Sequence, residues 1–129
     1  MKPVTEEWVG KAHGDMSVAE WEMKAREPVY DAVCFHAQQC VEKLLKAIIV
    51  EKGVGFPYTH DLIKLWEEAE PGPPVPDDLK RKLTFLSTFA IAFRYPGEEA
   101  TEEDARHALT TARELQGVIL KKLRDSETS

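Results

Sequence analysis

The amino-acid sequence predicts an all-α protein, folded as an up-and-down antiparallel bundle of four main helices plus one short helix. The segments between its prolines are rich in alanine, leucine, glutamate and lysine, which are good helix formers. The sequence has no strand-like alternation and no Asn-Gly or Asp-Gly hairpin signal. Short loops between the helices imply antiparallel neighbours. We therefore expect one domain over residues 1–129, with its core from about residue 5 to residue 124.

The first helix is expected from about Thr5 to Lys24, with Thr5 as its N-cap. Apolar residues recur along it at steps of three and four, as they do on one face of a helix. Gly10 and Gly14 lower its helix propensity, so a break or bend is expected near them. The apolar face is formed by Trp8, Ala12, Met16, Ala19 and Met23.

The second helix is expected from about Pro28 to Lys52. Proline suits a first helical turn, and Gly53 and Gly55 favour a helix end. Its apolar face is formed by Val33, Ala37, Cys40, Val41, Leu44 and Ile48, and is widened by Leu45 and Ile49. This helix and the fourth carry more apolar surface than one core contact requires, which predicts a homodimer. The alternative is that both faces of a central helix are covered inside the bundle.

The third helix is short and is expected from about Thr59 to Glu70. Thr59 is its expected N-cap, and Asp61 lies in the first turn, where a carboxylate interacts favourably with the helix dipole. Residues 71–76 contain four prolines and are expected to form a stiff loop before the next helix.

The fourth helix is expected from about Asp77 to Phe93, and Pro96 explains why it stops. Its two apolar strips are Leu79, Leu83, Leu86, Ala90 and Phe93, and Phe85, Phe89 and Ala92. The fifth helix is expected to begin at Thr101, because Thr101 and Asp104 have the spacing of a capping box. Its tail is expected to fray from Asp125.

Charge and hydropathy argue against several classes of function. The chain carries 17 Lys and Arg against 23 Asp and Glu, a formal net charge of −6, which disfavours broad binding to nucleic acid phosphates. No segment approaches the roughly 18 consecutive apolar residues of a membrane helix. The N-terminus also lacks an apolar signal region. We therefore expect a cytoplasmic protein without membrane contact.

The sequence contains none of the common cofactor or metal motifs. It has no Walker loop, Rossmann glycine pattern, zinc-protease motif, nucleophile elbow or Glu-x-x-His pair. Cys34 and Cys40 lie six residues apart on one expected helix, so they point in different directions and cannot pair. We expect them to be small buried hydrophobes, and we expect no metal and no cofactor.

One polar strip follows the second helix. His36, Gln39, Lys43 and Lys46 fall on it at steps of three and four. This pattern is typical of a polar seam between helices. The alternative is a surface that holds a phosphate or the backbone of a partner.

Two further polar pairs lie at helix ends. His60 and Asp61 open the third helix, where they either cap it or mark an anion site. Arg94 and Tyr95 end the fourth helix, where Arg94 either complements the helix dipole or binds a phosphate.

These residues belong to three strings that resemble HEPN domains (higher eukaryotes and prokaryotes nucleotide-binding). The strings are residues 35–47 (FHAQQCVEKLLKA), 59–62 (THDL) and 94–96 (RYP). The resemblance covers about Trp8 to Leu123 and is to small stand-alone prokaryotic members. It implies a helical bundle, often dimeric, that is commonly encoded beside a minimal nucleotidyltransferase as a toxin–antitoxin pair.

Many members resemble metal-independent ribonucleases. Their motif is an arginine followed by four to six residues and a histidine, which stabilise phosphate charge and move protons. In this sequence no histidine follows Arg94 until His107, and Glu98 and Glu99 lie between them. The ribonuclease motif is therefore not intact.

Three functions follow from the resemblance. The first is a binding module for a nucleotide, or for a nucleotidyltransferase that uses one, with its candidate residues in one groove between the second, third and fourth helices. Those candidate residues are His36, Gln39, Lys43, His60, Asp61, Arg94 and Tyr95. The second function is a ribonuclease toxin that uses Arg94 with His60 or His107. The third is a structural partner in which the strings serve packing and dimerisation.

Overall fold

The computed structural model describes residues 1–93 and 95–128, which contain five α-helices, one 3₁₀ turn and no strand. The helices are α1 (Pro3–Met23), α2 (Tyr30–Glu51), α3 (Leu62–Ala69), α4 (Asp77–Ser87) and α5 (Glu102–Thr128), with the 3₁₀ turn η1 (Thr88–Ala90) after α4. The predicted all-α class is confirmed. No helix of these residues is long and apolar enough to cross a membrane.

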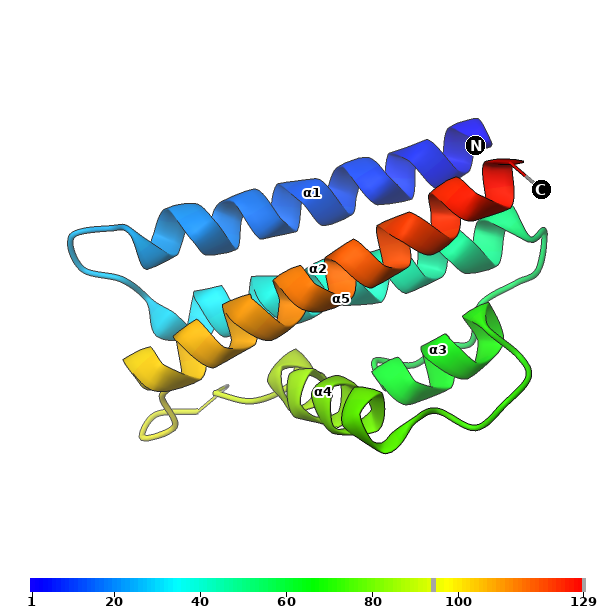
Figure 1. The fold of residues 1–129 in the computed structure, drawn as a ribbon. Helices are drawn as coiled ribbons and strands as arrows, with labels where there is room; N and C mark the ends of the chain where they lie inside the picture. Colours follow the sequence, from blue (N-terminus) through cyan, green and yellow to red (C-terminus); the bar gives the residue numbers. More distant parts are fainter. Residues whose placement is uncertain (94, 129) are drawn as a thin grey trace.

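Three long helices build the body of the molecule (Figure 1). α1 runs antiparallel to α2, and α5 lies along α2 in the same direction as α2. The two ends of the chain therefore meet, and the ammonium group of Met1 lies 3.6 Å from the carboxylate of Glu127. α3 and α4 cover the side of α2 and α5 that faces away from α1.

α2 is the central helix, because it packs against every other element. Val33, Leu44, Leu45 and Ile49 of α2 are fully buried, and Ile48 is nearly so. The wide apolar face of this helix is thus covered inside the bundle by its neighbours. It gives no support to a dimer, and the alternative of a central helix covered on both faces is correct.

α1 begins two residues earlier than predicted and continues without interruption through Gly10 and Gly14. Thr5 is not its N-cap. Its side chain is buried, and its hydroxyl donates a hydrogen bond to the carboxylate of Glu51 in α2 (2.7 Å). The prediction of the cap was wrong because a partner on another helix takes this hydroxyl.

α2 begins at Tyr30, so the prediction that Pro28 lies in its first turn was wrong. Pro28 belongs to the preceding loop, where the N–H of Val29 donates to the carboxylate of Glu22 (2.8 Å). The end of α2 agrees with the prediction. Gly53 follows it with a φ of 79°, a left-handed conformation that glycine adopts without strain.

α3 begins later than predicted, at Leu62, and its N-cap is Asp61 rather than Thr59. The Asp61 carboxylate accepts a hydrogen bond from the N–H of Ile63 (2.9 Å). The Thr59 hydroxyl accepts one from the N–H of Asp61 (3.0 Å) and so supports the cap itself. Asp61 therefore stabilises the helix start from the cap position.

α4 is shorter than predicted, because the helix ends at Ser87 and not at Phe93. The hydroxyl of Thr88 donates to the carbonyl of Phe85 (2.7 Å), and the backbone tightens into η1. Phe93 has a φ of 65°, so the chain has left the helical conformation there. The predicted site residue Arg94 lies outside the described residues.

The start of α5 confirms the predicted capping box. The N–H of Thr101 donates to the Asp104 carboxylate (2.9 Å), and the N–H of Asp104 donates to the Thr101 hydroxyl (3.0 Å). The helix then continues to Thr128, past Asp125, where the tail was expected to fray.

Both cysteines are free and buried, as predicted. Burial raises the pKa of Cys34 and of Cys40 to about 12, and nearby carboxylates act in the same direction. Both thiols therefore stay protonated near neutral pH and contribute as small apolar groups.

Replacing Leu44 by alanine is expected to lower the free energy of unfolding by about 2–5 kcal/mol, because it leaves a cavity beside the central helix. Val118→Ala is a matched control, since Val118 is 44% exposed on α5. Chemical denaturation of both variants measures the difference. Equal losses of unfolding free energy in Leu44→Ala and Val118→Ala would contradict the central role of α2.

Candidate functional site

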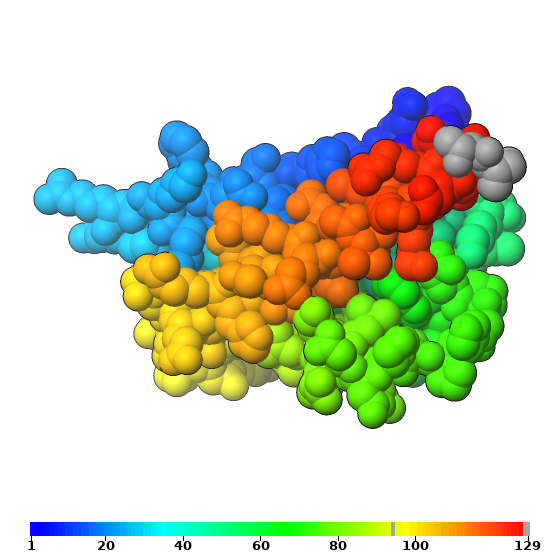
Figure 2. Space-filling model, in the orientation of Figure 1, coloured from blue at the N-terminus to red at the C-terminus, as the bar shows by residue number. Residues whose placement is uncertain are grey.

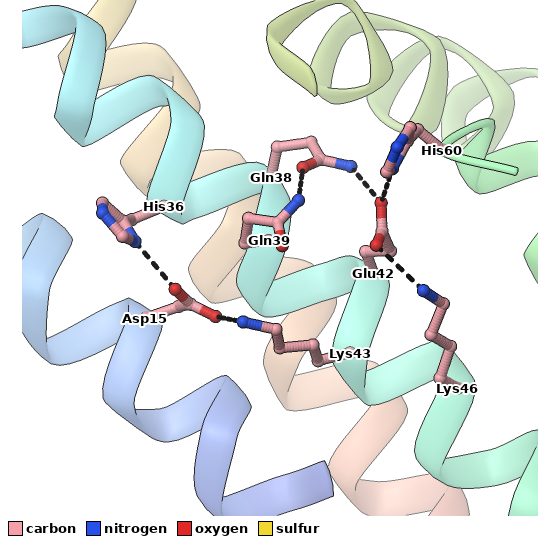
Figure 3. A network of polar contacts seen from close by, with 8 residues as sticks. All are labelled: Asp15, His36, Gln38, Gln39, Glu42, Lys43, Lys46 and His60. Atoms are coloured by element: carbon pink, nitrogen blue, oxygen red, sulfur yellow. Dashed lines mark hydrogen bonds and ion pairs between the residues drawn. The ribbon is translucent and has the colours of Figure 1, made fainter. Parts of the chain in front are cut away.

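Two buried carboxylates organise the polar residues around α2 (Figure 3). Asp15 in α1 is 8% exposed, and Glu42 in α2 is 3% exposed. Each of them binds one lysine and one histidine. Burying a carboxylate is costly unless it is paired and hydrogen-bonded, so the fold depends on these partners. Within the described residues, no three His, Cys, Asp or Glu side chains are placed to hold a metal ion.

Asp15 connects α1 to α2. Nδ1 of His36 lies 2.7 Å from its Oδ1, and Nζ of Lys43 lies 2.5 Å from its Oδ2. His36 and Lys43 are seven residues, or about two helical turns, apart on α2. The carboxylate of the neighbouring helix therefore enters between them. This part of the predicted polar strip is a seam between two helices.

Glu42 connects α2 to the segment that precedes α3. Its Oε1 accepts a hydrogen bond from Nε2 of Gln38 (2.9 Å) and lies 2.8 Å from Nδ1 of His60. Its Oε2 accepts one from Nζ of Lys46 (3.1 Å). Gln39 extends the network, because its Nε2 donates to the side-chain oxygen of Gln38 (2.8 Å).

The surroundings of Glu42 hold its carboxyl group in the ionised form. Burial raises its pKa, but the hydrogen bonds from Gln38, His60 and Lys46 outweigh burial, and the resulting pKa lies below the ordinary value. An ionised carboxylate can only accept hydrogen bonds, so Nδ1 of His60 carries a hydrogen and donates a hydrogen bond to Glu42. In the neutral imidazole, Nε2 is then left as a free acceptor.

His60 opens onto a groove of about 490 Å³ between the start of α3 and the α4–η1 segment. Its side chain is 62% exposed, although Nδ1 is held by a buried group. The hydroxyl of Ser87 accepts a hydrogen bond from the N–H of Leu62 (2.9 Å) and joins the two walls of the groove. The wall is mainly apolar, and its lining includes His60, Asp61, Thr84, Thr88, Ala90 and Ile91.

The structure divides the predicted binding residues between separate places. His36 and Lys43 are drawn towards α1 by Asp15, while Gln39 and His60 belong to the network around Glu42. His60 and Asp61 line the groove. Tyr95 is 71% exposed, and Arg94 lies outside the described residues. The expected convergence in one groove between the second, third and fourth helices was therefore wrong for the residues that the structure describes.

The two histidines considered for ribonuclease chemistry have different surroundings. His107 lies on α5 and stacks on Phe85, with ring centroids 4.0 Å apart and an interplanar angle of 24°. His60 instead has a carboxylate partner, Glu42, at hydrogen-bonding distance. A carboxylate that orients an imidazole is a common arrangement for a group that accepts or donates protons.

Sequence reasoning missed Asp15, Gln38 and Glu42, although a signal was present. Asp15 lies three residues after the buried Ala12, on the apolar face of its helix. Gln38, Glu42 and the buried Leu45 follow one another at steps of four and three. A polar residue in an apolar register indicates a buried hydrogen-bonded group or ion pair.

Comparison with known proteins identifies the family. The profile of the HEPN domain matches residues 5–123. The chain belongs to the HEPN domain family. One relative, from Methanocaldococcus jannaschii, is named as a candidate toxin, MJ1304. It is 28% identical to this chain, and the alignment covers 87% of this chain and 83% of that protein.

Solved structures share the fold of this HEPN domain. TT1696 from Thermus thermophilus has a TM-score of 0.78 at 22% identity, covering 92% of this chain and 97% of that one. ST0689, described as an archaeal HEPN homologue, has a TM-score of 0.75 at 24% identity, with coverages of 95% and 98%. A HEPN domain protein from Thermotoga maritima has a TM-score of 0.73 at 18% identity, with coverages of 92% and 98%.

The substitution Glu42→Gln is expected to lower the free energy of unfolding by about 1.5–3 kcal/mol near neutral pH, because it weakens hydrogen bonds to Lys46 and His60. Glu67→Gln is the control, since Glu67 is exposed on α3. Urea denaturation measures both variants.

The pH dependence gives this test a second readout. The pKa of Glu42 is lowered in the folded chain. Its contribution to the free energy of unfolding is therefore fully present at pH values above its ordinary pKa of 4.5, and it is lost as the pH falls through the pKa of the folded state. The difference between wild type and Glu42→Gln should therefore shrink in acid. A constant difference would show that ionisation of Glu42 is not its source.

Proposed function

We propose that this HEPN domain is a binding module that acts in the cytoplasm as a homodimer, with a minimal nucleotidyltransferase as its partner, and that its groove at His60 binds a nucleotide or that partner. The observation that supports this most directly is the state of His60. Its Nδ1 is fixed by buried Glu42, while the rest of the ring faces the groove. A side chain that is both oriented and exposed is prepared for a ligand.

The apolar wall and the hydroxyl groups suit a mixed ligand. Ala90 and Ile91 provide apolar surface on which a nucleobase or an apolar partner side chain can lie. Thr84 provides a hydroxyl group that can donate or accept a hydrogen bond, and the Thr88 hydroxyl, which donates to the carbonyl of Phe85, can still accept one. When it is protonated, His60 can donate a hydrogen bond through Nε2 to one phosphate or carbonyl group, and when it is neutral Nε2 can accept one from a hydroxyl or amino group.

Charge favours such a ligand over an RNA chain. Lys43 and Lys46 are each bound to a buried carboxylate, so the cations of the α2 strip are neutralised within the chain. Glu98 and Glu99 lie exposed on the segment before α5. Binding along a phosphate backbone requires several uncompensated cations, which these parts of the chain do not supply.

Titration calorimetry with ATP, GTP and their monophosphates tests the groove. We expect one nucleotide to bind, and His60→Ala to weaken it by roughly tenfold, which corresponds to about 1.4 kcal/mol. His13→Ala is the matched control, because His13 is an exposed histidine on α1, away from the groove. If no nucleotide binds, the minimal nucleotidyltransferase that we propose as the partner should be captured by wild type and lost with His60→Ala. Failure of both would contradict the proposal.

A metal-independent ribonuclease toxin is the second candidate, and the Glu42–His60 pair is the observation that favours it. The relative named as a candidate toxin adds support. Incubation with total RNA in the presence of a chelator tests it, with Arg94→Ala, His60→Ala and His107→Ala as variants. Cleavage that survives His107→Ala and is lost in the other two variants would assign the reaction to Arg94 and His60. Absence of cleavage by wild type would exclude the ribonuclease and leave the binding module as the proposed function.

A further inference from the structure

The exposed side of α4 carries polar residues that neither the core nor the network around Glu42 uses. Two of them are the cations Lys80 and Arg81, and Thr84 follows about one helical turn later. All three residues are exposed. In the view of Figure 2, α4 (yellow-green) lies at the lower surface of the molecule, and no other segment lies in front of it. This side of α4 is therefore open to a ligand.

A second groove lies along this side of α4 and meets the groove at His60. It has a volume of about 470 Å³ and is lined by Asp77, Lys80, Arg81, Thr84 and Phe85. Thr84 also lines the groove at His60. The two grooves are therefore neighbours on one helix, and a single ligand can occupy both.

The chemistry of the lining changes in order along the two grooves. Ile91, just after η1, gives one end an apolar wall, and Thr84 and Thr88 place hydroxyl groups in the middle. Arg81 and Lys80 place two cations at the other end. Arg81 and Thr88 are seven residues apart, which is about 10 Å along a helix. This order of apolar surface, hydroxyl groups and cations matches the base, the sugar and the phosphates of a nucleotide.

The two cations are weakly engaged within the chain. Lys80 has no ion-pair partner among the residues that the structure describes. Nη2 of Arg81 lies 3.5 Å from the Asp78 carboxylate, and these side chains are 74% and 70% exposed, so the pair contributes little. Lys82 differs, because its Nζ lies 3.2 Å from the carboxylate of Asp78 and 2.8 Å from that of Glu114. Lys80 and Arg81 are thus the cations of α4 that remain for an external anion.

We propose that Lys80 and Arg81 bind the terminal phosphates of a nucleotide whose nucleoside lies in the groove at His60. The site then favours nucleoside triphosphates over monophosphates, because a single phosphate beside the sugar stops short of the two cations. Two cations suffice for one short polyphosphate, whereas an RNA chain requires more of them. This inference rests on the proposed function and names the class of ligand that the same groove takes.

Asp77 marks the far end of this phosphate subsite. Its carboxylate lines the same groove, three and four residues before the two cations. It also lies in the first turn of α4, where a negative charge stabilises the helix. A carboxylate repels a phosphate at short range, so Asp77 weakens the binding of the last phosphate.

Titration calorimetry with AMP, ADP and ATP tests the phosphate subsite, with a chelator present so that no divalent cation masks the phosphate charge. We expect wild type to bind ATP roughly tenfold more tightly than AMP. Lys80→Ala and Arg81→Ala should each weaken ATP binding roughly fivefold and leave AMP binding unchanged. Asp77→Asn should tighten ATP binding roughly twofold. All three positions are exposed, so these variants should keep the fold.

Matched controls lie on two other helices. Lys64 is an exposed lysine of α3 that lines neither groove. Arg106 is an exposed arginine of α5 whose Nε lies 3.5 Å from the exposed carboxylate of Glu102, much as Arg81 lies beside Asp78. Lys64→Ala and Arg106→Ala should bind ATP as wild type does. Inorganic tripolyphosphate should compete with ATP for wild type and should not compete with AMP.

The results distinguish the phosphate subsite from the nucleotide groove itself. Equal affinities of wild type for AMP and ATP would overturn the subsite and keep the groove at His60. The same holds if Lys80→Ala and Arg81→Ala leave ATP binding unchanged, or if they weaken AMP binding as much as ATP binding. Binding of no nucleotide would overturn the subsite, and capture of the proposed nucleotidyltransferase partner would then decide the proposed function.

Discussion

The burial of one carboxylate on the central helix determines much of this structure. Glu42 is almost inaccessible to solvent, and its charge is retained because three side chains donate hydrogen bonds to it. One of those donors, His60, comes from the segment before α3, so the same interaction that stabilises the charge also fixes where α3 begins to pack on α2. In the same way, the buried carboxylate of Asp15 in α1 binds His36 and Lys43 and so fixes how α1 packs on α2.

This arrangement links stability to the function that we propose. The polar residues of α2 take part in buried ion pairs and hydrogen bonds within the chain, while the ring of His60 is left facing the groove that we propose as the binding site. The comparison structures share the fold at identities below 25%. The HEPN fold is therefore kept while most of the sequence changes.

The sequence was sufficient for the helices but not for the first residues of α1, α2 and α3 or for the site. Periodicity located all five helices, and the capping box placed the start of α5 because both of its partners are local. Thr5 failed as a cap because Glu51, far along the chain, binds its hydroxyl. The predicted site residues lie apart for the same reason, which is that partners distant in the sequence bind them. Asp15 draws His36 and Lys43 towards α1, and no spacing within α2 contains that information.

The meeting of the chain ends has a consequence for the order in which this bundle can be assembled. Met1 and Glu127 form an ion pair, so the start of α1 and the end of α5 lie side by side. A short linker between them would close the chain into a ring, which could be opened in the proline-rich loop of residues 71–76 without cutting a helix. The fold is thus defined by which helices touch and not by which one is made first. A circularly permuted chain should reach the same native packing.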